Sequence, residues 1–524
     1  MITLLDYGAG NVKSVVNAIE KLGRQIKLVS KPLDILNAQK LVFPGVGNYE
    51  SMIKVLHEKK YINPLREYIK QDQPFLGICL GMQVLFEQSE EDQSNKESLA
   101  IFKGMVKRFE TKMAVPHIGW NGVNLKQDSP IFKDILADTK FYFVHSYHVV
   151  PKDKEIILTS TFYDYEFASS VQKNNIIGTQ FHPEKSSKQG IKLLDNFINQ
   201  KDLRPKRKID IKGKTLSKRI IACLDVRAND EGDLVVTKGD KYDVREKGNI
   251  RNMGKPVELA KRYYEQGADE ITFLNITGFR DFVLEDLPMI KVLEHTSKNV
   301  FVPLTIGGGI KDYIDKNNKK YTALDIAEKY FRSGADKISI GSDAVDIAKQ
   351  YLKTGKKTGK SSIEQISKIY GSQAVVISID PRRIYLNQSI KNTIKTKFLG
   401  PNNEEYCWYQ CMTQGGRMPT DMEVIQLAKA CQELGAGEIL LNCIDKDGTN
   451  SGFDLELINF VQSHVDIPII ASSGAGKKED FVEVFEQTSA QAALAAGIFH
   501  RNEVSIQSVK KCLANKKIEV TEYG

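Results

Sequence analysis

The segment PFLGICLGMQVLF, Pro74–Phe86, places Cys79 midway between Gly77 and Gly81, where a predicted strand meets a predicted helix. Small residues on both sides permit the sharp strand-to-helix turn that lifts a nucleophile above a sheet. The helix N-terminus adds partial positive charge near the sulfur and favours the reactive thiolate. Most free cysteines are small buried hydrophobic residues, so this corner indicates catalysis only if a base and an oxyanion site accompany it.

Two other segments supply these partners. The run NNIIGTQFHPEKSS places His182 two residues before Glu184, after another predicted strand. A histidine can accept the thiol proton, and a neighbouring carboxylate can orient the ring and stabilise its charge. The glycine turn in FPGVGNYE exposes backbone N–H groups near Val46, and the N–H of Leu80 directly follows the nucleophile. These N–H groups are the expected oxyanion donors.

The chain divides at a polar, basic stretch, NQKDLRPKRKIDIKGKTLSKR. Before it, short predicted strands such as MITLLDYG, KLVFPGVG and PFLGICLG alternate with helical patterns, which is typical of an open α/β sheet. A chain of 524 residues is long enough for two or three domains. We predict a first domain over residues 1–203, a basic linker over 204–215 and a second domain over 216–524.

The second domain is predicted to be a closed barrel. Eight short apolar runs follow the linker, in the order RIIACLDV, EITFLNI, VFVPLTIGGG, KISIGS, AVVISIDPRR, EILLNCID, IPIIASSGAG and AALAAGIF. Helical patterns such as PVELAKRYYEQGAD lie between many of them. Eight such units over about 300 residues predict a (β/α)₈ TIM barrel with insertions. The insertions are expected around KTGKKTGKSS and KNTIKTKFLGPNNEEYCWYQC.

The two halves of the barrel sequence resemble each other. ACLDVR in strand one resembles ISIDPRR in strand five, GGG after strand three resembles GAG after strand seven, and IGS mirrors AGI. Glycine-rich turns with unpaired N–H groups suit phosphate, although glycines also simply end βα loops. The repeat predicts two phosphate sites and a substrate with a phosphate at each end. The expected residues are Gly308, Gly309, Gly341 and Ser342 in one half, and Gly474, Ala475, Gly476, Ala496 and Gly497 in the other.

Aspartates mark the predicted carboxyl ends of several strands, where the active sites of such barrels lie. Asp225 is expected at the end of strand one and Asp380 at the end of strand five, on opposite sides of the barrel. Asp445 and Asp447 follow strand six. A single aspartate at such a place is commonly a helix N-cap or a turn residue. Two carboxylates that face each other across one pocket instead suit general acid–base chemistry.

Composition narrows the class of protein. Hydrophobic residues make up 41% and charged residues 27%, as in soluble globular proteins. No apolar run is long enough for a membrane span, and the start MITLLDYGAGN does not resemble a secretory signal. The 7 scattered cysteines indicate reduced thiols and a cytoplasmic location, and they predict no metal site. The net charge of +8 suits an anionic small substrate, because acids and bases are interspersed and no nucleic-acid-binding motif is present.

The motifs together resemble a known family. GICLGMQ, FHPE and PGVG resemble the class I glutamine amidotransferases. DYGAGN, PHIGWN and FVHSY narrow the resemblance to the glutaminase part of the imidazole glycerol phosphate synthase family. IACLDVR, TIGGGI, GADKISIGSDA, GAGEILLNCIDKDG and IASSGAG resemble its cyclase part, as in the fused enzymes of fungi and plants. The resemblance covers nearly the whole chain and implies a bifunctional enzyme of histidine biosynthesis that uses no cofactor.

The resemblance implies a role for each motif. Cys79 would attack the glutamine amide and form a glutamyl thioester, with His182 moving the proton and Glu184 orienting His182. Ammonia would then react in the barrel with N′-[(5-phosphoribulosyl)formimino]-AICAR-phosphate, giving imidazole glycerol phosphate and AICAR. Asp225 and Asp380 would transfer protons in this reaction. The other residues implied around the barrel substrate are Asp447, which would assist catalysis, and Lys238, Asn275 and Thr277, which would bind substrate.

Ammonia released into water would be protonated and lost at neutral pH, so the first domain is expected to dock on the barrel. The catalytic face holds the substrate, which makes the opposite, N-terminal face the expected dock. Charged residues begin four of the strands there and form a predicted polar gate: Arg219, Glu270, Lys337 and Glu438. Charge at that face more commonly only stabilises the barrel.

Two other interpretations are weighed against the synthase. A glutaminase fused to a related phosphosugar isomerase barrel would also carry two opposed aspartates, but it would need no ammonia. A scaffold that only binds phosphorylated ligands is expected to lack a catalytic residue, and none is missing. The expected partners are therefore glutamine and a diphosphorylated small molecule, and a monomer is sufficient because both domains lie in one chain.

Overall fold

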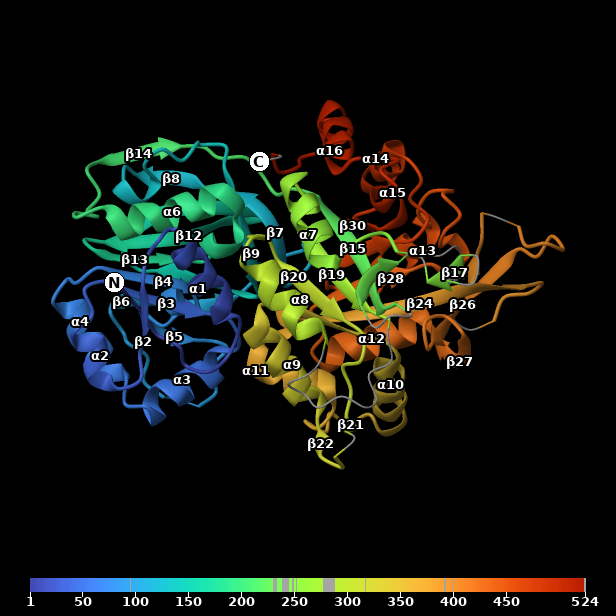
Figure 1. The fold of residues 1–524 in the computed structure, drawn as a ribbon, viewed down its shortest axis with the longest axis horizontal. Helices are drawn as coiled ribbons and strands as arrows, with labels where there is room; N and C mark the ends of the chain where they lie inside the picture. The colour runs from blue at the N-terminus through green and yellow to red at the C-terminus, as the bar shows by residue number, and fades with distance from the viewer. Residues whose placement is uncertain are drawn as a thin grey trace.

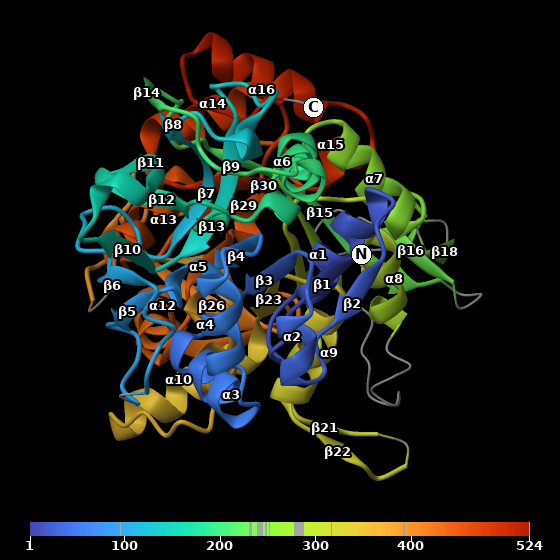
Figure 2. The ribbon, with the colours of Figure 1, turned by 90° about the vertical axis from the view of Figure 1, so that its left-hand side faces the viewer.

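The structure is a computed structural model that describes residues 1–94, 96–229, 233–237, 245–246, 249–250, 252–276, 288–315, 317–390, 393–397 and 399–522. It has two domains that lie side by side, as the blue-to-green and green-to-red halves of Figure 1 show. Figure 2 looks onto the first domain, with the barrel behind it.

The first domain is built on a twisted sheet with the strand order β14-β8-β11-β12-β13-β4-β3-β1-β2, to which β5, β6 and β10 are added. Its central strands β1 to β4 and β13 run parallel to their neighbours, which places the carboxyl ends of β3 and β4 together. Strands of this domain are β1 (Ile2–Leu4), β2 (Ile26–Leu28), β3 (Leu41–Gly45), β4 (Phe75–Cys79), β5 (Phe86–Ser89), β6 (Phe102–Arg108), β7 (His117–Gly122), β8 (Asn124–Gln127), β9 (Lys140–His145), β10 (Tyr147–Pro151), β11 (Ile157–Tyr163), β12 (Tyr165–Lys173), β13 (Ile176–Thr179) and β14 (Lys208–Ile211).

Helices cover both faces of this sheet because each carries an apolar stripe. The buried residues of α1 and α6 belong to one core cluster, and those of α2, α3 and α4 belong to another. The helices are α1 (Val12–Lys21), α2 (Pro32–Leu36), α3 (Tyr49–Glu58), α4 (Ile62–Lys70), α5 (Leu80–Gln83) and α6 (Ser187–Asn199). The open α/β sheet predicted from the alternating pattern is therefore confirmed.

The second domain is a closed eight-stranded parallel barrel. Its strands follow the order β23-β20-β19-β15-β30-β29-β28-β24, and β23 pairs with β24 to close the ring. Small and branched side chains such as Ile221, Val376 and Leu440 fill the interior. The strands are β15 (Arg219–Ala228), β19 (Glu270–Asn275), β20 (Leu304–Gly307), β23 (Lys337–Ile340), β24 (Val375–Leu386), β28 (Glu438–Asn442), β29 (Ile469–Ser472) and β30 (Ala492–Ala495). They match the eight predicted runs in order.

The outer ring of the barrel consists of helices, which pack on the strands through a single large core. They are α7 (Pro256–Glu265), α8 (Pro288–Ser297), α9 (Ala323–Ser333), α10 (Ser342–Thr354), α11 (Ser362–Tyr370), α12 (Val424–Leu434), α13 (Leu455–Gln462), α14 (Lys478–Gln487), α15 (Gly497–His500) and α16 (Ile506–Asn515). Short strands decorate the barrel at β16 (Leu234–Thr237), β17 (Arg245–Glu246), β18 (Asn249–Ile250), β21 (Tyr313–Ile314), β22 (Lys320–Tyr321), β25 (Ile394–Lys395), β26 (Tyr406–Thr413) and β27 (Met418–Glu423).

Barrel strands one and five do not end where the sequence predicted. β15 continues past Asp225 and pairs antiparallel with β16, and β24 continues past Asp380 and pairs antiparallel with β26. The aspartates therefore lie within long strands, where the parallel barrel pairing gives way to a hairpin. The predicted insertion after strand five is the partner of this hairpin, which projects from the end of the barrel farthest from the first domain (Figure 1).

The two domains meet at the N-terminal ends of the barrel strands, on the face predicted for docking. Asn11 donates hydrogen bonds to the Gly334 carbonyl at 2.9 Å and to the Asp336 carboxylate at 2.7 Å. Trp120 Nε1 donates to the Asp269 carbonyl at 3.1 Å. Part of the predicted linker forms β14, which pairs with β8 and extends the sheet of the first domain.

Candidate active sites

Cys79 occupies a strained corner between β4 and α5. Its backbone has φ +54° and ψ −105°, and its side chain is buried. A Cβ added at Gly77 would lie 2.1 Å from the Gly81 carbonyl oxygen, and one at Gly81 would lie 2.0 Å from the Phe43 carbonyl oxygen. Both glycines are therefore required by close backbone approach. This is the geometry of a nucleophile elbow.

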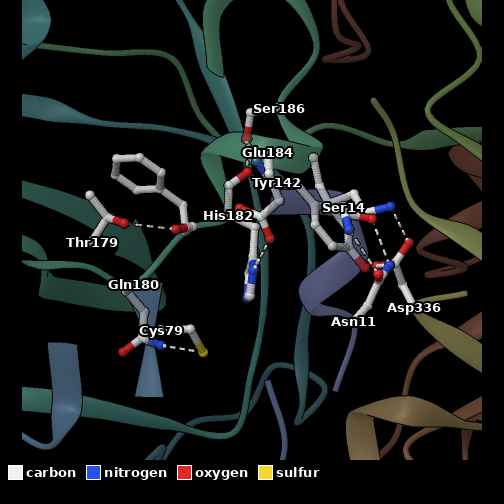
Figure 3. A network of polar contacts seen from close by, with 12 residues as sticks. Asn11, Ser14, Cys79, Tyr142, Thr179, Gln180, His182, Glu184, Ser186 and Asp336 are labelled. Carbon is white, nitrogen blue, oxygen red and sulfur yellow. Dashed lines mark hydrogen bonds and ion pairs between the residues drawn. The ribbon is translucent and has the colours of Figure 1, made fainter. Parts of the chain in front are cut away.

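His182 and Glu184 form a buried pair beside this corner (Figure 3). His182 Nδ1 lies 2.8 Å from Glu184 Oε1, and both side chains are 3% exposed. Burial disfavours a charged ring, but Glu184 and the Cys79 thiol outweigh it and raise the pKa of His182 to about 10. Within the described chain, His182 Nε2 has no hydrogen-bond partner at normal distance. The ring is thus oriented by Glu184 and keeps one nitrogen available toward the thiol.

Two glutamines that the sequence analysis did not single out complete this corner. Gln180 Nε2 lies 3.3 Å from Cys79 Sγ. Gln83 Nε2 donates at 3.1 Å both to Gln180 Oε1 and to the Tyr147 carbonyl. Both glutamines lie inside the quoted motifs, GICLGMQ and GTQFHPE, but their contact spans about a hundred residues of sequence, since 97 positions separate them. The spacing within each motif does not predict that contact.

Three further histidines form a separate cluster. His117 Nδ1 lies 3.2 Å from His145 Nε2, and His148 Nε2 lies 2.9 Å from the Tyr165 hydroxyl. Burial lowers the pKa of His145 to about 3 and that of His148 to about 4. These rings are neutral at physiological pH and pack against Phe109. Their environment is that of a buried aromatic cluster.

The predicted oxyanion donors flank the nucleophile. Gly45, which precedes Val46, is the register partner of Cys79 in the β3–β4 pairing. Leu80 begins α5 directly after Cys79. The Val46 carbonyl accepts a hydrogen bond from the Tyr7 hydroxyl, which holds this turn against the first strand.

A polar cavity of about 460 Å³ lies between the domains, and Tyr147, whose carbonyl accepts a hydrogen bond from Gln83, lines it. Tyr147, Asn48 and Glu91 line it from the first domain, and the end of α11 lines it from the barrel. Burial raises the pKa of Glu91 to about 7, although the Tyr49 backbone N–H and the Asn48 side-chain amide donate to its carboxylate at 3.1 and 2.9 Å. The sequence analysis did not find Glu91, because only the tertiary structure brings it to the cavity.

The second candidate site lies in the barrel around Asp225 and Asp380. The two strands that carry them, β15 and β24, are separated by three strands in either direction around the ring. Asn442 Nδ2 donates to Asp380 Oδ1 at 2.9 Å. Burial raises the pKa of Asp380, and the nearby Asp447 carboxylate raises it further. The buried Asp447 thus belongs to the same electrostatic environment as Asp380.

The predicted phosphate sites have matching backbone geometry in the two halves. After β20, Gly308 and Gly309 have φ of +92° and +77°, and after β29, Ser473 and Gly474 have φ of +74° and +95°. The residues before the next helices also match: φ and ψ are −110° and −101° at Gly341, and −125° and −74° at Ala496. Successive residues of this kind form concave nests of backbone N–H groups that suit anions.

Some of the remaining predicted residues of these sites lie within the described part of the chain, and others do not. Asn275 is buried at the end of β19. Lys238 and Thr277 lie outside the described residues. The other predicted members of the phosphate sites take their expected places after β23, β29 and β30: Ser342, Ala475, Gly476 and Gly497. No group of three or more metal-ligating side chains is placed to hold an ion in the described part of the chain.

The four charged residues of the predicted gate form a closed ring at the N-terminal end of the barrel. Each cation contacts both anions: Arg219 contacts Glu270 at 2.8 Å and also Glu438, and Lys337 contacts each glutamate at 2.7 Å. All four side chains are at most 1% exposed. Burial favours neutral Glu438, but Arg219 and Lys337 lower its pKa. Two positive and two negative charges therefore balance inside the protein.

Comparisons with known proteins match both domains. A family model described as "Glutamine amidotransferase class-I" matches residues 3–201, and one described as "Histidine biosynthesis protein" matches residues 219–505. The chain is 55% identical to the chloroplastic imidazole glycerol phosphate synthase hisHF of Arabidopsis thaliana over 99% of this chain and 89% of that protein. It is 49% identical to the hisHF synthase of Emericella nidulans over 100% of this chain and 99% of that protein. The chain belongs to the imidazole glycerol phosphate synthase family.

The family membership accounts for the two separate sites. The HisF subunit of imidazole glycerol phosphate synthase from Methanocaldococcus jannaschii is 40% identical over 58% of this chain and 98% of its own length, so it corresponds to one part of the fused chain. The chain combines glutamine amidotransferase and cyclase activities of histidine biosynthesis, as the full-length synthase relatives and the two family models support. Among the described residues, no helix is long and apolar enough to cross a lipid bilayer.

Proposed function

We propose that the chain hydrolyses glutamine at Cys79, passes ammonia through the barrel, and uses it to convert N′-[(5-phosphoribulosyl)formimino]-AICAR-phosphate to imidazole glycerol phosphate and AICAR. The observation that supports the proposal is that the His182–Glu184 pair beside Cys79 lies in the first domain, the buried ring of charges begins the barrel strands, and Asp225 and Asp380 lie farther along β15 and β24. The test is product formation by the purified chain with glutamine or with ammonium salt as nitrogen source. Failure with both sources would overturn the cyclase assignment.

The glutaminase steps follow from the geometry at Cys79. The thiolate attacks the carboxamide carbon of glutamine, and the N–H groups of Leu80 and Val46 receive the oxyanion. His182 takes the thiol proton and delivers it to the leaving ammonia, while Glu184 holds the ring in place. Water then attacks the glutamyl thioester, and the same imidazole accepts its proton. The contact of Gln180 with Sγ positions the nucleophile.

Glu91 is proposed to bind the ammonium group of glutamine. It is a half-buried carboxylate in a cavity bordered by Tyr147, and the Tyr147 carbonyl is linked through Gln83 and Gln180 to Cys79. Tyr7 lies close to both Cys79 and Glu91. Burial is the main cause of the raised pKa of Tyr7, and the charges of Cys79 and Glu91 raise it further. A cation that neutralises a buried carboxylate removes an unfavourable isolated charge.

Glutamine binding is therefore expected to weaken as pH falls through about 7, the raised pKa of Glu91. Above that pH the carboxylate is ionised and attracts the ammonium group, and below it the protonated carboxyl does not. KM for glutamine should rise about tenfold between pH 8 and pH 6, because a lost charge-assisted contact is worth roughly 1–2 kcal/mol. Steady-state glutaminase kinetics between pH 8 and pH 6 measure this change in KM. The Glu91→Gln variant should have a high KM for glutamine that does not depend on pH. A wild-type KM that is flat with pH would contradict the assignment.

The cyclase steps are proposed for the barrel face that carries Asp225 and Asp380. Their opposed positions allow one group to donate a proton and the other to accept one during cleavage of the carbon–nitrogen bond and ring closure. The raised pKa of Asp380 favours a carboxyl that can hold a proton, with Asp447 adjusting its charge state. The two matching backbone nests would bind the two phosphates of the substrate, and Lys238, Asn275 and Thr277 are further proposed substrate contacts.

The buried ring is proposed as the gate through which ammonia enters the barrel. Tyr142 lies on the glutaminase side of it: its carbonyl accepts the His182 backbone N–H at 2.9 Å, and the charges of Glu270 and Arg219 act on its hydroxyl. The ring is neutral as a whole, so a neutral molecule meets no net charge there. Ammonia transferred along this route stays away from bulk water, where it would be protonated.

Replacing Lys337 with Met is expected to uncouple the two reactions, because the two glutamates would then carry an uncompensated negative charge that retains ammonium. The ratio of glutamate formed to imidazole glycerol phosphate formed should rise at least about twofold. The free energy of unfolding of the protein should fall by about 3–5 kcal/mol, because a buried ion pair is broken. Product stoichiometry and urea unfolding measure both effects. Lys349→Met removes a surface lysine paired with Asp421 and is the matched control. An unchanged stoichiometry would restrict the ring to a stabilising role.

The proposal also covers the domain boundaries, the oligomeric state and the location of the protein in the cell. We propose the boundaries 1–203 and 216–524 with the linker 204–215, although β14 lies within that linker and belongs to the sheet of the first domain. A monomer is proposed, since both sites lie in one chain, with no nucleic-acid or membrane partner. All 7 cysteines are free, which supports a reducing, cytoplasmic location. The chloroplastic relative makes an organelle the alternative that localisation of a tagged chain would decide.

A further inference from the structure

Val46 directly follows the end of β3, and the residue before it is fixed by the sheet. Gly45 pairs with Cys79 across β3 and β4. A Cβ added at Gly45 would lie 2.4 Å from Leu80 Cβ, so the backbone here runs against the first residue of α5. The sheet therefore determines the direction of the peptide group before Val46. The peptide group after Val46 belongs to the turn that leaves the sheet, and it needs a separate constraint.

Tyr7, in the segment after β1, supplies this constraint. Its hydroxyl donates a hydrogen bond to the Val46 carbonyl, and its buried ring packs edge-on against Phe43 of β3 with 6.1 Å between the ring centroids. Gly10 approaches the same carbonyl, since a Cβ added there would lie 2.6 Å from the Val46 oxygen. Because a peptide group is planar, a fixed Val46 carbonyl also fixes the direction of the Gly47 N–H.

The position of Tyr7 is determined by its neighbours in the chain. The Asp6 carboxylate accepts a hydrogen bond from the Gly8 backbone N–H at 2.9 Å, which closes a tight turn around Tyr7. The same carboxylate accepts one from Arg332 Nη1, on α9 of the barrel, at 2.7 Å. The backbone on both sides of the tyrosine is thus anchored, so its hydroxyl can hold the Val46 carbonyl in one place.

The Tyr7 hydroxyl keeps its proton in this environment. Burial is the main cause that raises the pKa of Tyr7 well above its usual value, and the charges of Cys79 and Asp6 raise it further. A protonated phenol donates to a carbonyl at physiological pH and does not accept the thiol proton. Tyr7 is therefore suited to orienting the backbone and not to acid–base chemistry.

We propose that Tyr7 is a positioning residue for glutamine hydrolysis: it holds the turn at Val46 so that the Val46 N–H, together with the Leu80 N–H, receives the oxyanion. The inference rests on the proposed glutaminase steps. Tyr7 acts through the backbone and does not touch the reacting atoms. Without the hydroxyl, the Val46 carbonyl loses this donor, and the peptide after Val46 becomes free to rotate. The oxyanion donor is then correctly placed for only part of the time.

The test is Tyr7→Phe, which removes the hydroxyl and keeps the ring. With the diphosphate substrate saturating, kcat for glutamate formation should fall about 10- to 100-fold, because a misplaced donor loses part of the roughly 10²–10³-fold contribution of an oxyanion donor. KM for glutamine should stay within about threefold, and the ammonium-driven reaction within about twofold. Alkylation of Cys79 by iodoacetamide should also keep its rate within about twofold, since the thiolate displaces iodide and no oxyanion forms.

Tyr68→Phe is the matched control. Tyr68 on α4 is also buried, and its hydroxyl donates to the Pro74 carbonyl at 2.8 Å, so the same kind of hydrogen bond is lost in the same domain. This variant should keep kcat within about twofold of wild type. If kcat of Tyr7→Phe lies within about twofold of the control, or if alkylation slows as much as hydrolysis, the inference is wrong. If wild type forms no glutamate from glutamine, the proposed function fails instead, so the two failures are distinguishable.

Discussion

Replacing Cys79 with Ala is expected to abolish product formation from glutamine and to leave the ammonium-driven reaction within about twofold of wild type. The thiolate is the only group at the elbow between β4 and α5 that can form the thioester, and removal of such a nucleophile costs about 10³-fold or more. The proposed barrel site lies beyond the buried ring, so it is not expected to use the thiol. Initial rates with each nitrogen source, measured on the same preparation, give the result.

The control for this experiment is Cys431→Ala. Cys431 is also buried, but it lies on α12 of the barrel and is not among the residues that line the cavity between the domains. It should lose some stability and keep both activities. Loss of the ammonium-driven reaction in Cys79→Ala would mean that the two sites are not separable as proposed. Retention of the glutamine-driven reaction would remove Cys79 from the mechanism.

Replacing Asp380 with Asn is expected to abolish product formation with either nitrogen source. The carboxamide has nearly the same shape and can still pair with Asn442, but it cannot transfer a proton. The loss should be about 10²–10⁴-fold in kcat, the usual contribution of a general acid or base. Glutamine hydrolysis without substrate should be unaffected, because Asp380 lies at the opposite end of the barrel from the first domain.

Measuring substrate binding by Asp380→Asn shows whether the lost activity comes from lost proton transfer or from a disturbed structure. Asp380→Asn should still bind the diphosphate substrate with a Kd within about fivefold of wild type, measured by calorimetry, since the phosphate nests are unchanged. Asp421→Asn, at an exposed position on β27, is the control for removing one carboxylate. A kcat within tenfold of wild type for Asp380→Asn would assign the proton transfers elsewhere.

The geometry of the corner at Cys79 was predictable because it depends on residues that are close in the sequence. The elbow at Cys79 depends on two glycines within two residues, and His182 and Glu184 are neighbours in the chain. Residues so close in the chain keep the same relative positions wherever the strand and the helix form. The eight barrel strands were predictable for a related reason, since buried parallel strands appear as short apolar runs.

The lengths of barrel strands one and five were not predictable. The sequence analysis ended them at Asp225 and Asp380, but both strands continue into hairpins with β16 and β26. Alternating polar residues beyond the barrel look like loop in the sequence, and only pairing with a distant segment makes them strand. The linker was misjudged similarly, because Lys208–Ile211 becomes β14 only by pairing with β8.

By itself, then, the sequence determined the two-domain architecture, the sharp turn at Cys79, the opposed strands of Asp225 and Asp380, and the matching turns after β20 and β29. Only the tertiary structure decided that Glu91 lies in the cavity between the domains and that four charged residues close into one ring, Arg219, Glu270, Lys337 and Glu438. The physical reason is the range of the interactions. Backbone turns and hydrophobic periodicity act over a few residues, whereas a buried charge finds its partners only when strands far apart in the chain pack together.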